Sequence, residues 1–351
     1  MDYYRTQTEF NCGIDLHSRQ MYSCVMDPAG EKLLHANIRN NDFDYFLRRV
    51  EPWRHDMTVV CESTFNWYWL ADACCEAGIE FVLAHSLYLK HIHGGKNKND
   101  RIDSEKLAHL LRANLIPPAY AYPAARRPTR ALFRQRMRFV WKRSSLMGQL
   151  RMNQHAEGIK PAAGKTGSRD EWEANILDQY ANPVHRFSAQ MNMEMIRSYD
   201  RQIKLIERRL KNEARKDFAV ELAIAKSAPG IAWILAMSIL YEVDTIDRFP
   251  TVKDFLSYCR LVKGSVASAG KFKGLKGAKM GNAYLRWAFG QAAMVAKRSD
   301  PLIKAYADRL IARHGKYKGN AILAAKMARA VYFMLERKTV FDAGKLVSAK
   351  I

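Results

Sequence analysis

Short apolar runs separated by turn residues fill the first part of this 351-residue chain, and they limit its fold more than any other feature. Residues 10–17, 21–27 and 31–38 predict three short strands, and Asp27-Pro28-Ala29-Gly30 supplies a turn between the last two. An amphipathic helix is expected near 41–50. The chain therefore begins as an antiparallel sheet.

Helix and strand patterns then alternate. Strands are predicted at 57–63 and 80–86, with a helix near 66–77 between them and a helix at 103–113 after them. Antiparallel strands followed by alternating helices and strands predict an α/β domain with a mixed sheet. A proline-rich stretch marks its end.

The remaining sequence is dominated by helical patterns from about residue 129 onward. We predict three domains: an α/β domain at 1–125, a basic helical and coiled-coil region at 126–220, and a mostly α-helical C-terminal domain at 221–351.

Within the middle region, apolar residues recur at alternating three- and four-residue spacing between residues 188 and 217. They are Ile196, Tyr199, Ile203, Ile206 and Leu210. Such a seam is typical of a coiled coil. An ordinary amphipathic helix that packs on its own domain explains the pattern equally well.

Charge is the next constraint, because the formal net charge is +22. A protein this basic attracts polyanions, of which nucleic acid is the commonest. Acids are absent between Glu105 and Glu157 and again between Asp254 and Asp300. The expected nucleic-acid-binding residues are Arg126, Arg127, Arg130, Arg134, Arg138, Lys142 and Arg143 in the first segment and Lys271, Lys273, Lys276, Lys279 and Arg286 in the second. The alternative is that both segments are solubilising surfaces.

Four acids stand at the ends of predicted elements. Asp15 ends one predicted strand and Glu62 ends another, so their carboxylates are expected at one edge of the sheet. Asp100 and Asp103 are spaced i, i+3 at a predicted helix start, which puts them on nearly the same face. Structural roles are the alternative: Asp103 as a helix N-cap and Asp15 as a turn residue.

Together, four carboxylates suit a pair of hard cations such as Mg²⁺ or Mn²⁺ held about 4 Å apart. Such a pair stabilises the attacking and leaving oxygens of a phosphoryl transfer. The carboxylates would repel one another without a cation. The sequence therefore predicts a metal site formed by Asp15, Glu62, Asp100 and Asp103.

A family resemblance rests on these same segments. GIDLHS, CEST and KNKNDRIDSEKLA resemble the D-E-D-D signature of the DEDD insertion-sequence transposases. SAPGIAWILA and KMGNAYLRWAFGQAAM resemble that family's C-terminal transposase domain. The family is related to the Piv DNA invertase, and its N-terminal domain resembles the RuvC Holliday-junction resolvase. The resemblance implies an RNase H-like (RuvC-like) fold for the first domain and assigns the four acids as the metal-binding tetrad.

The resemblance also implies that a serine of the C-terminal domain attacks DNA and forms a covalent phosphoserine intermediate. Ser268 is the best match, and Ser265 is the alternative nucleophile. The sequence departs from the family pattern in Leu261-Val262-Lys263, where a proline usually follows the leucine, and at Ala269, where a glycine is common. Without the family, GSVASAGKFKGLKGAKMGN at 264–282 is a flexible loop whose backbone and lysines hold phosphates.

We therefore expect a metal-dependent DNA recombinase that inserts its own element. Its expected partners are donor and target DNA, a structured guide RNA (implied by the resemblance alone) and further copies of the chain, as a dimer or tetramer. No membrane segment is expected, and the location is expected to be cytoplasmic and nucleoid-associated. One alternative is a RuvC-like structure-selective endonuclease in which water attacks. Another is a non-catalytic nucleic-acid-binding protein with structural acids.

Overall fold

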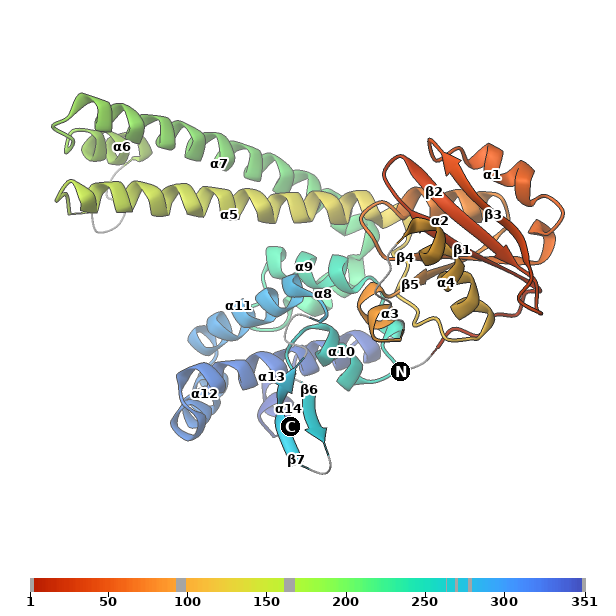
Figure 1. The fold of residues 1–351 in the computed structure, drawn as a ribbon. Helices are drawn as coiled ribbons and strands as arrows, with labels where there is room; N and C mark the ends of the chain where they lie inside the picture. Colours follow the sequence, from red (N-terminus) through yellow and green to blue (C-terminus); the bar gives the residue numbers. More distant parts are fainter. Residues whose placement is uncertain are drawn as a thin grey trace. The chain divides into compact units, whose positions relative to one another are not determined.

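The computed structural model describes residues 3–92, 99–160, 168–262, 264–268, 271–276 and 280–348. Of residues 265–268, 271–273, 275 and 276 it describes the backbone alone. The chain divides into two compact units, Met1–Ala125 and Arg126–Ile351, which Figure 1 draws from red to orange and from yellow to blue. The predicted boundary at residue 220 lies inside the second unit and stays a prediction.

A five-stranded mixed sheet forms the centre of the first unit, with strand order β3-β2-β1-β4-β5 (Figure 1). β1 (Phe10–Leu16), β2 (Gln20–Met26) and β3 (Lys32–Arg39) are antiparallel neighbours. β4 (Met57–Glu62) and β5 (Glu80–Ala84) extend the sheet in parallel with β1. The predicted mixed sheet is confirmed.

Helices cover both faces of this sheet. α1 (Phe43–Val50) and α2 (Tyr68–Glu76) pack on one face, where Phe46 and Leu70 join Ile14 of β1 in one apolar core. α4 (Asp100–Arg112) packs on the other face, where Leu107 and Leu111 join Val60 of β4. Because side chains alternate along a strand, neighbouring strand residues feed opposite cores.

Two predicted boundaries near the acids need correction. The helix predicted at 103–113 begins at Asp100, because the Asn99 side chain accepts the Arg101 N–H and caps the helix there. The strand predicted at 80–86 ends at Ala84, and Ser86 begins the short helix α3 (Ser86–Ile92). Asp103 is therefore a residue of the first helical turn and not an N-cap.

In its described residues, the second unit consists of helices and one β-hairpin (Figure 1). Its helices are α5 (Arg127–Ala156), α6 (Arg169–Leu177), α7 (Pro183–Asp217), α8 (Ala219–Lys226), α9 (Trp233–Val243), α10 (Val252–Tyr258), α11 (Ala283–Ser299), α12 (Pro301–His314), α13 (Lys316–Arg337) and α14 (Ala343–Ser348). The hairpin pairs β6 (Gly264–Ser268) with β7 (Lys271–Lys276) in a stretch expected to be a loop. Three-residue 3₁₀ helices lie at Arg54–Asp56, Ala124–Arg126 and Ile246–Arg248.

The predicted apolar seam of α7 is covered within the chain. Ile196, Ile203 and Leu210 are buried, and α7 packs along α5 (Figure 1). The ion pairs Arg136–Glu207 and Arg143–Asp200 show that the two helices are antiparallel, because the partner number falls as the α5 number rises. The seam is therefore covered by another helix of the same unit, α5, in an antiparallel pair. The coiled coil stays a prediction.

No helix among the described residues combines the length and apolar character needed to cross a bilayer.

Candidate functional site

Asp15 and Glu62 lie at the carboxyl end of the parallel pair β1–β4. Ile14 pairs with Cys61, so Asp15 and Glu62 are the next register position on adjacent strands, which run about 4.8 Å apart. Both follow, by two residues, positions that face α4: Gly13 on β1 and Val60 on β4. The two residues therefore belong to the sheet face that α4 covers, at the edge where the sequence predicted them.

Gly13 explains how close α4 comes to this face. A Cβ at Gly13 would lie 2.2 Å from the Ser104 carbonyl oxygen and 2.4 Å from the Ala108 nitrogen. Only a residue without a side chain permits this contact between helix and strand. The first turn of α4, with Asp100 and Asp103, is held against the β1 end by this approach. Sequence reasoning did not single out Gly13, although it is the glycine of GIDLHS.

His17 joins the acids and was not predicted as a site residue. Its Nε2 lies 3.2 Å from Asp15 Oδ2 and 3.4 Å from Asp100 Oδ1. Donor atoms of Asp15, His17 and Asp100 all lie within 4.8 Å of one another. Among the described residues, Glu62 and Asp103 do not join this tightest group. The structure thus brings two of the four predicted acids together with one histidine.

Asp103 contributes to the negative charge that acts on Asp15. Burial raises the pKa of Asp15, the neighbouring His17 lowers it, and the charges of Asp100 and Asp103 raise it, so the pKa is raised overall. Lys106 Nζ lies 3.4 Å from Asp103 Oδ1. No arginine contacts Asp15 or Asp100 in the part of the chain that the structure describes. Among the described residues, Asp15 and Asp100 thus have His17 and Gln20 as side-chain partners.

This donor set fits a divalent cation. Carboxylate oxygens are the ligands that Mg²⁺ and Mn²⁺ take, and a cation offsets both the burial and the repulsion from Asp100 and Asp103 that raise the pKa of Asp15. Asp15 and Asp100 hold the geometry from a strand end and a helix start. Glu62 and Asp103 lie on the same side as further carboxylates. This arrangement of carboxylates can hold a metal ion beside a phosphodiester.

The serine-bearing hairpin is described by its backbone. Ser268 pairs with Lys271 and Ser265 with Leu275, but the side chains of these serines lie outside the described residues. So do the side chains of Lys271, Lys273 and Lys276, and the whole of Lys279. The nucleophile assignment therefore stays a prediction.

Downstream of the hairpin, the chain is fixed to the end of α10. A Cβ at Gly281 would lie 2.4 Å from the Tyr258 carbonyl oxygen, and Gly281 has φ +94°, which glycine adopts without strain. Arg260 Nε donates to the Gly281 carbonyl at 2.7 Å. The Asn282 side chain caps α11 by accepting the N–H groups of Tyr284 and Leu285.

A buried acid, Glu242 of α9, organises several arginines expected on the nucleic-acid surface. Arg134 donates to both of its carboxylate oxygens at 2.7 Å, and Arg130 Nη2 donates at 2.9 Å. Asn282 Nδ2 donates at 2.7 Å, which ties this cluster to the α11 cap. Glu242 is fully buried; burial raises its pKa, but the two guanidinium groups outweigh it and the pKa is lowered.

Two further predicted arginines also have acidic partners within the unit. Arg126 Nη1 lies 2.6 Å from Asp244 Oδ1, and Arg143 pairs with Asp200. An acid inside the otherwise apolar α9 sequence, WILAMSILYEV, is the signal that could have revealed Glu242. Absence of acids from a segment does not leave its arginines unpaired, because the partners come from other helices.

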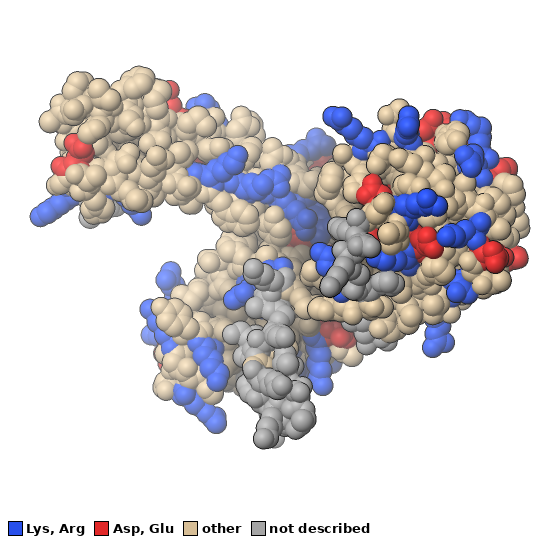
Figure 2. All heavy atoms as spheres, in the orientation of Figure 1, with Lys and Arg blue, Asp and Glu red and all other residues tan. Residues whose placement is uncertain are grey.

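Other predicted cationic residues lie on the surface. Arg138 and Lys142 of α5 and Arg286 of α11 are exposed. Trp141, also exposed, stacks on Tyr284 of α11 with ring centroids 5.9 Å apart. Lysine and arginine side chains follow one another over α5 in Figure 2. These residues present cationic and aromatic groups to solvent, the combination that holds nucleic-acid backbone and bases.

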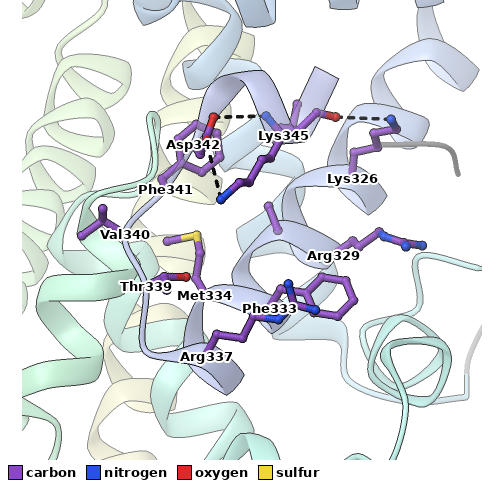
Figure 3. A pocket seen from close by; sticks show the side chains of 12 residues that line it. Lys326, Arg329, Phe333, Met334, Arg337, Thr339, Val340, Phe341, Asp342 and Lys345 are labelled. Carbon is purple, nitrogen blue, oxygen red and sulfur yellow. Dashed lines mark hydrogen bonds and ion pairs between the residues drawn. The ribbon is translucent and has the colours of Figure 1, made fainter. Parts of the chain in front are cut away.

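The second unit also has a cavity of about 350 Å³ between α13 and the segment leading into α14 (Figure 3). Arg329 and Arg337 flank the Phe333 ring, with guanidinium carbons 5.5 and 4.6 Å from its centroid. Lys326 donates to the Leu346 carbonyl across the cavity wall. The basic side chains that line this cavity add to the positive charge of the unit.

Comparison with known proteins accounts for this arrangement. A family model of DEDD transposases of the IS110 type matches residues 12–156, which include all four predicted acids. A second, described as the transposase IS116/IS110/IS902 family, matches residues 222–308, which include Glu242 and the serine hairpin. The chain is also 22% identical, over 95% of its length and 91% of the relative's, to the transposase for insertion sequence element IS1111A of Coxiella burnetii (strain RSA 493 / Nine Mile phase I). The two family models describe the same family, and together they match more than half of the chain. The chain therefore belongs to the IS110 family of DEDD transposases.

Proposed function

We propose that this transposase cuts and rejoins the DNA of its own insertion element through a covalent phosphoserine intermediate, with divalent metal held by the acidic edge of the first unit. The carrying observation is the convergence of Asp15 and Asp100, with His17 between them, where β1 ends and α4 begins. The strand order β3-β2-β1-β4-β5, with β2 antiparallel, supports an RNase H-like (RuvC-like) fold for this unit.

Asp15, Glu62, Asp100 and Asp103 are the proposed metal-holding residues. Mg²⁺ or Mn²⁺ bound there supplies positive charge for the phosphate oxygens. The residues themselves have distinct tasks. Asp15 and Glu62 hold their positions through the sheet register, whereas Asp100 and Asp103 depend on the seating of α4 at Gly13.

Ser268 is the proposed nucleophile, and Ser265 is the alternative. The serine Oγ–phosphorus bond forms as the bond from phosphorus to one deoxyribose oxygen breaks, and the serine proton passes to that leaving oxygen by way of a base or water. A hydroxyl of the joining strand then attacks the phosphoserine, forms the new phosphodiester and returns a proton to the serine oxygen. Every bond broken is replaced, so the exchange needs no external energy source.

The second unit is the proposed nucleic-acid surface. Arg138 and Lys142 of α5 and Arg286 of α11 are exposed, and the exposed Trp141 lies between the first two in the α5 sequence. Phosphate contact by Arg126, Arg127, Arg130, Arg134 and Arg143, and by the lysines of the hairpin, remains part of the proposal. Donor DNA, target DNA and a structured guide RNA are the proposed ligands; the family resemblance supports the RNA.

Trapping the intermediate tests the reaction. Protein incubated with donor DNA and metal, then denatured, should yield a protein–DNA adduct that is lost in Ser268→Ala and kept in Ser265→Ala. If the adduct is instead lost in Ser265→Ala and kept in Ser268→Ala, Ser265 is the nucleophile. An adduct that persists in both variants would contradict the assignment of the nucleophile to either serine of this hairpin.

A water-using, RuvC-like endonuclease is the second candidate, because the acidic edge alone suffices for hydrolysis. It predicts nicked DNA with free ends and no adduct.

The guide RNA is tested by digesting the nucleic acid that co-purifies with the protein, separately with RNase and with DNase. A discrete RNase-sensitive species is expected. Light scattering with donor DNA distinguishes the proposed dimer from a tetramer. A cytoplasmic, nucleoid-associated location is part of the proposal, because DNA is its substrate.

A further inference from the structure

His17 occupies a fixed place at the acidic edge. Its backbone N–H donates to the Gln20 carbonyl at 2.9 Å. Its carbonyl accepts from Asn66 Nδ2 at 3.0 Å and from Asn41 Nδ2 at 3.2 Å. These contacts come from three separate segments, so the turn after β1 is held from several sides. The imidazole is thereby directed at the acids, although half of its side-chain surface remains exposed.

The spacing of the three donors matches that of ligands around one ion. Metal–ligand bonds of about 2.0–2.2 Å put adjacent octahedral ligands about 3 Å apart and opposite ligands about 4.2 Å apart. His17 Nε2 lies 3.2 and 3.4 Å from the nearest oxygens of Asp15 and Asp100, and the whole group lies within 4.8 Å. One cation can therefore contact all three donors after small side-chain shifts.

Gln20 supports this arrangement from behind. Its Nε2 donates to Asp100 Oδ2 at 3.2 Å, and its Oε1 accepts from Asn37 Nδ2 at 3.0 Å. The second oxygen of Asp100 is thus engaged by β2, and Oδ1 is the oxygen near His17. Hydrogen bonds of this kind orient metal-ligating carboxylates and strengthen binding.

We propose that His17 Nε2 is a direct metal ligand, which makes the site a mixed nitrogen–oxygen centre that selects Mn²⁺ over Mg²⁺. Mg²⁺ prefers oxygen ligands and keeps several waters, whereas imidazole is a better ligand for first-row transition ions. An all-carboxylate tetrad carries no such preference. The inference rests on the metal site of the proposed function and adds both a ligand and an ion preference to it.

One other arrangement accounts for the same distances. A protonated His17 can donate to one carboxylate and attract the other, standing where a cation would bind. A metal would then have to displace the imidazole. The two arrangements differ in sign: removal of a ligand weakens metal binding, whereas removal of a competing cation strengthens it.

Pulsed electron paramagnetic resonance of Mn²⁺ bound to the full-length protein distinguishes them. Nitrogen nuclear modulation is expected for wild type, absent for His17→Ala and retained for the control His55→Ala, which changes an exposed histidine of the same unit. Calorimetric titration should show Mn²⁺ affinity reduced by about 10–100-fold in His17→Ala, the cost of disturbing a metal's protein shell. Mg²⁺ affinity should fall by a smaller factor.

Mn²⁺ bound to wild type without nitrogen modulation would overturn the ligand and leave the carboxylate site intact. Tighter Mn²⁺ binding by His17→Ala would show that the imidazole competes with metal. Failure of wild type to bind either ion would overturn the metal site itself and this inference with it. The failure of the ligand and the failure of the proposed function are thus separate results.

Discussion

Each unit of this transposase holds a buried or half-buried carboxylate within a polar group, and the two groups, around Glu242 and around Asp15, are stabilised in opposite ways. In the second unit, Glu242 is fully buried and receives hydrogen bonds from Arg130, Arg134 and Asn282. In the first unit, Asp15 and Asp100 are partly exposed and have His17 and Gln20 as partners. Burial acts on both groups, but among the described residues arginine pairs with Glu242 and not with Asp15 or Asp100.

The pKa directions express this difference. Burial raises the pKa of Asp15, and the nearby acids keep it raised; at Glu242 the guanidinium groups outweigh burial and lower the pKa. The charge of a buried carboxylate that pairs with two arginines is already compensated by the protein, so such a group has a structural role. A carboxylate group without arginine partners suits the cation proposed above, at a cost in stability that functional sites commonly carry.

Removal of Asp15 should have the largest functional effect. We expect Asp15→Ala to reduce DNA strand cleavage by at least about 10²–10³-fold, the cost of losing one electrostatic group from a transition state. Nucleic-acid binding should persist, because the cationic surface is unchanged. Gel-based cleavage and filter binding measure the two. Unchanged recombination in Asp15→Ala would remove the basis of the proposed metal site.

Removal of Glu242 should have the largest effect on stability. Glu242→Ala leaves Arg130 and Arg134 without their buried partner and should cost about 3–5 kcal/mol of unfolding free energy in the second unit. Asp178→Ala is the matched control, since it breaks the exposed pair with Arg186 and should cost less than about 1 kcal/mol. Urea denaturation followed by circular dichroism gives both values. Equal losses would refute the structural role of Glu242.

Gly13→Ala tests whether the seating of α4 builds the acidic edge. The new methyl group would overlap the α4 backbone at Ser104, which should cost about 1–3 kcal/mol and weaken Mn²⁺ binding. Gly148→Ala is the control: that α5 glycine has open space around its Cβ, so the change should stabilise by about 0.5–1 kcal/mol. Mn²⁺ affinity that survives Gly13→Ala would separate helix seating from metal binding.

The smallest effect should be a difference in pH response. A lowered pKa at Glu242 means that its contribution is present above the unfolded pKa and lost as the pH falls through the folded value. A raised pKa at Asp15 means the reverse for metal-free protein: stability is present below the unfolded pKa and lost as the pH rises through the folded value.

Asp15→Asn should therefore raise the melting temperature of metal-free protein by a few degrees at neutral pH and have little effect at low pH. Calorimetry with and without Mn²⁺ checks it, because added metal should stabilise wild type more than the variant. A lower melting temperature for metal-free Asp15→Asn would mean that the carboxylate is stabilised by the protein itself, as Glu242 is.

The sequence by itself determined the mixed sheet, the helical second unit and the four acids at element ends. These follow from local patterns: alternation along strands, periodicity along helices, and acids placed where strands end. The apolar seam of α7 was also visible, but its partner was not, because α5 covers it from a distant part of the chain.

Only the tertiary structure decided which charges are neutralised. Arg130 and Glu242 are 112 residues apart, and no local pattern links them. His17 became a site residue because α4 brings Asp100 to it, and that approach depends on the missing Cβ of Gly13. Charge and periodicity are properties of a segment, whereas the pairing of a charge is set by whatever the fold packs against it. The sequence therefore indicated where acids and bases gather, and packing determined which acids remain for a metal.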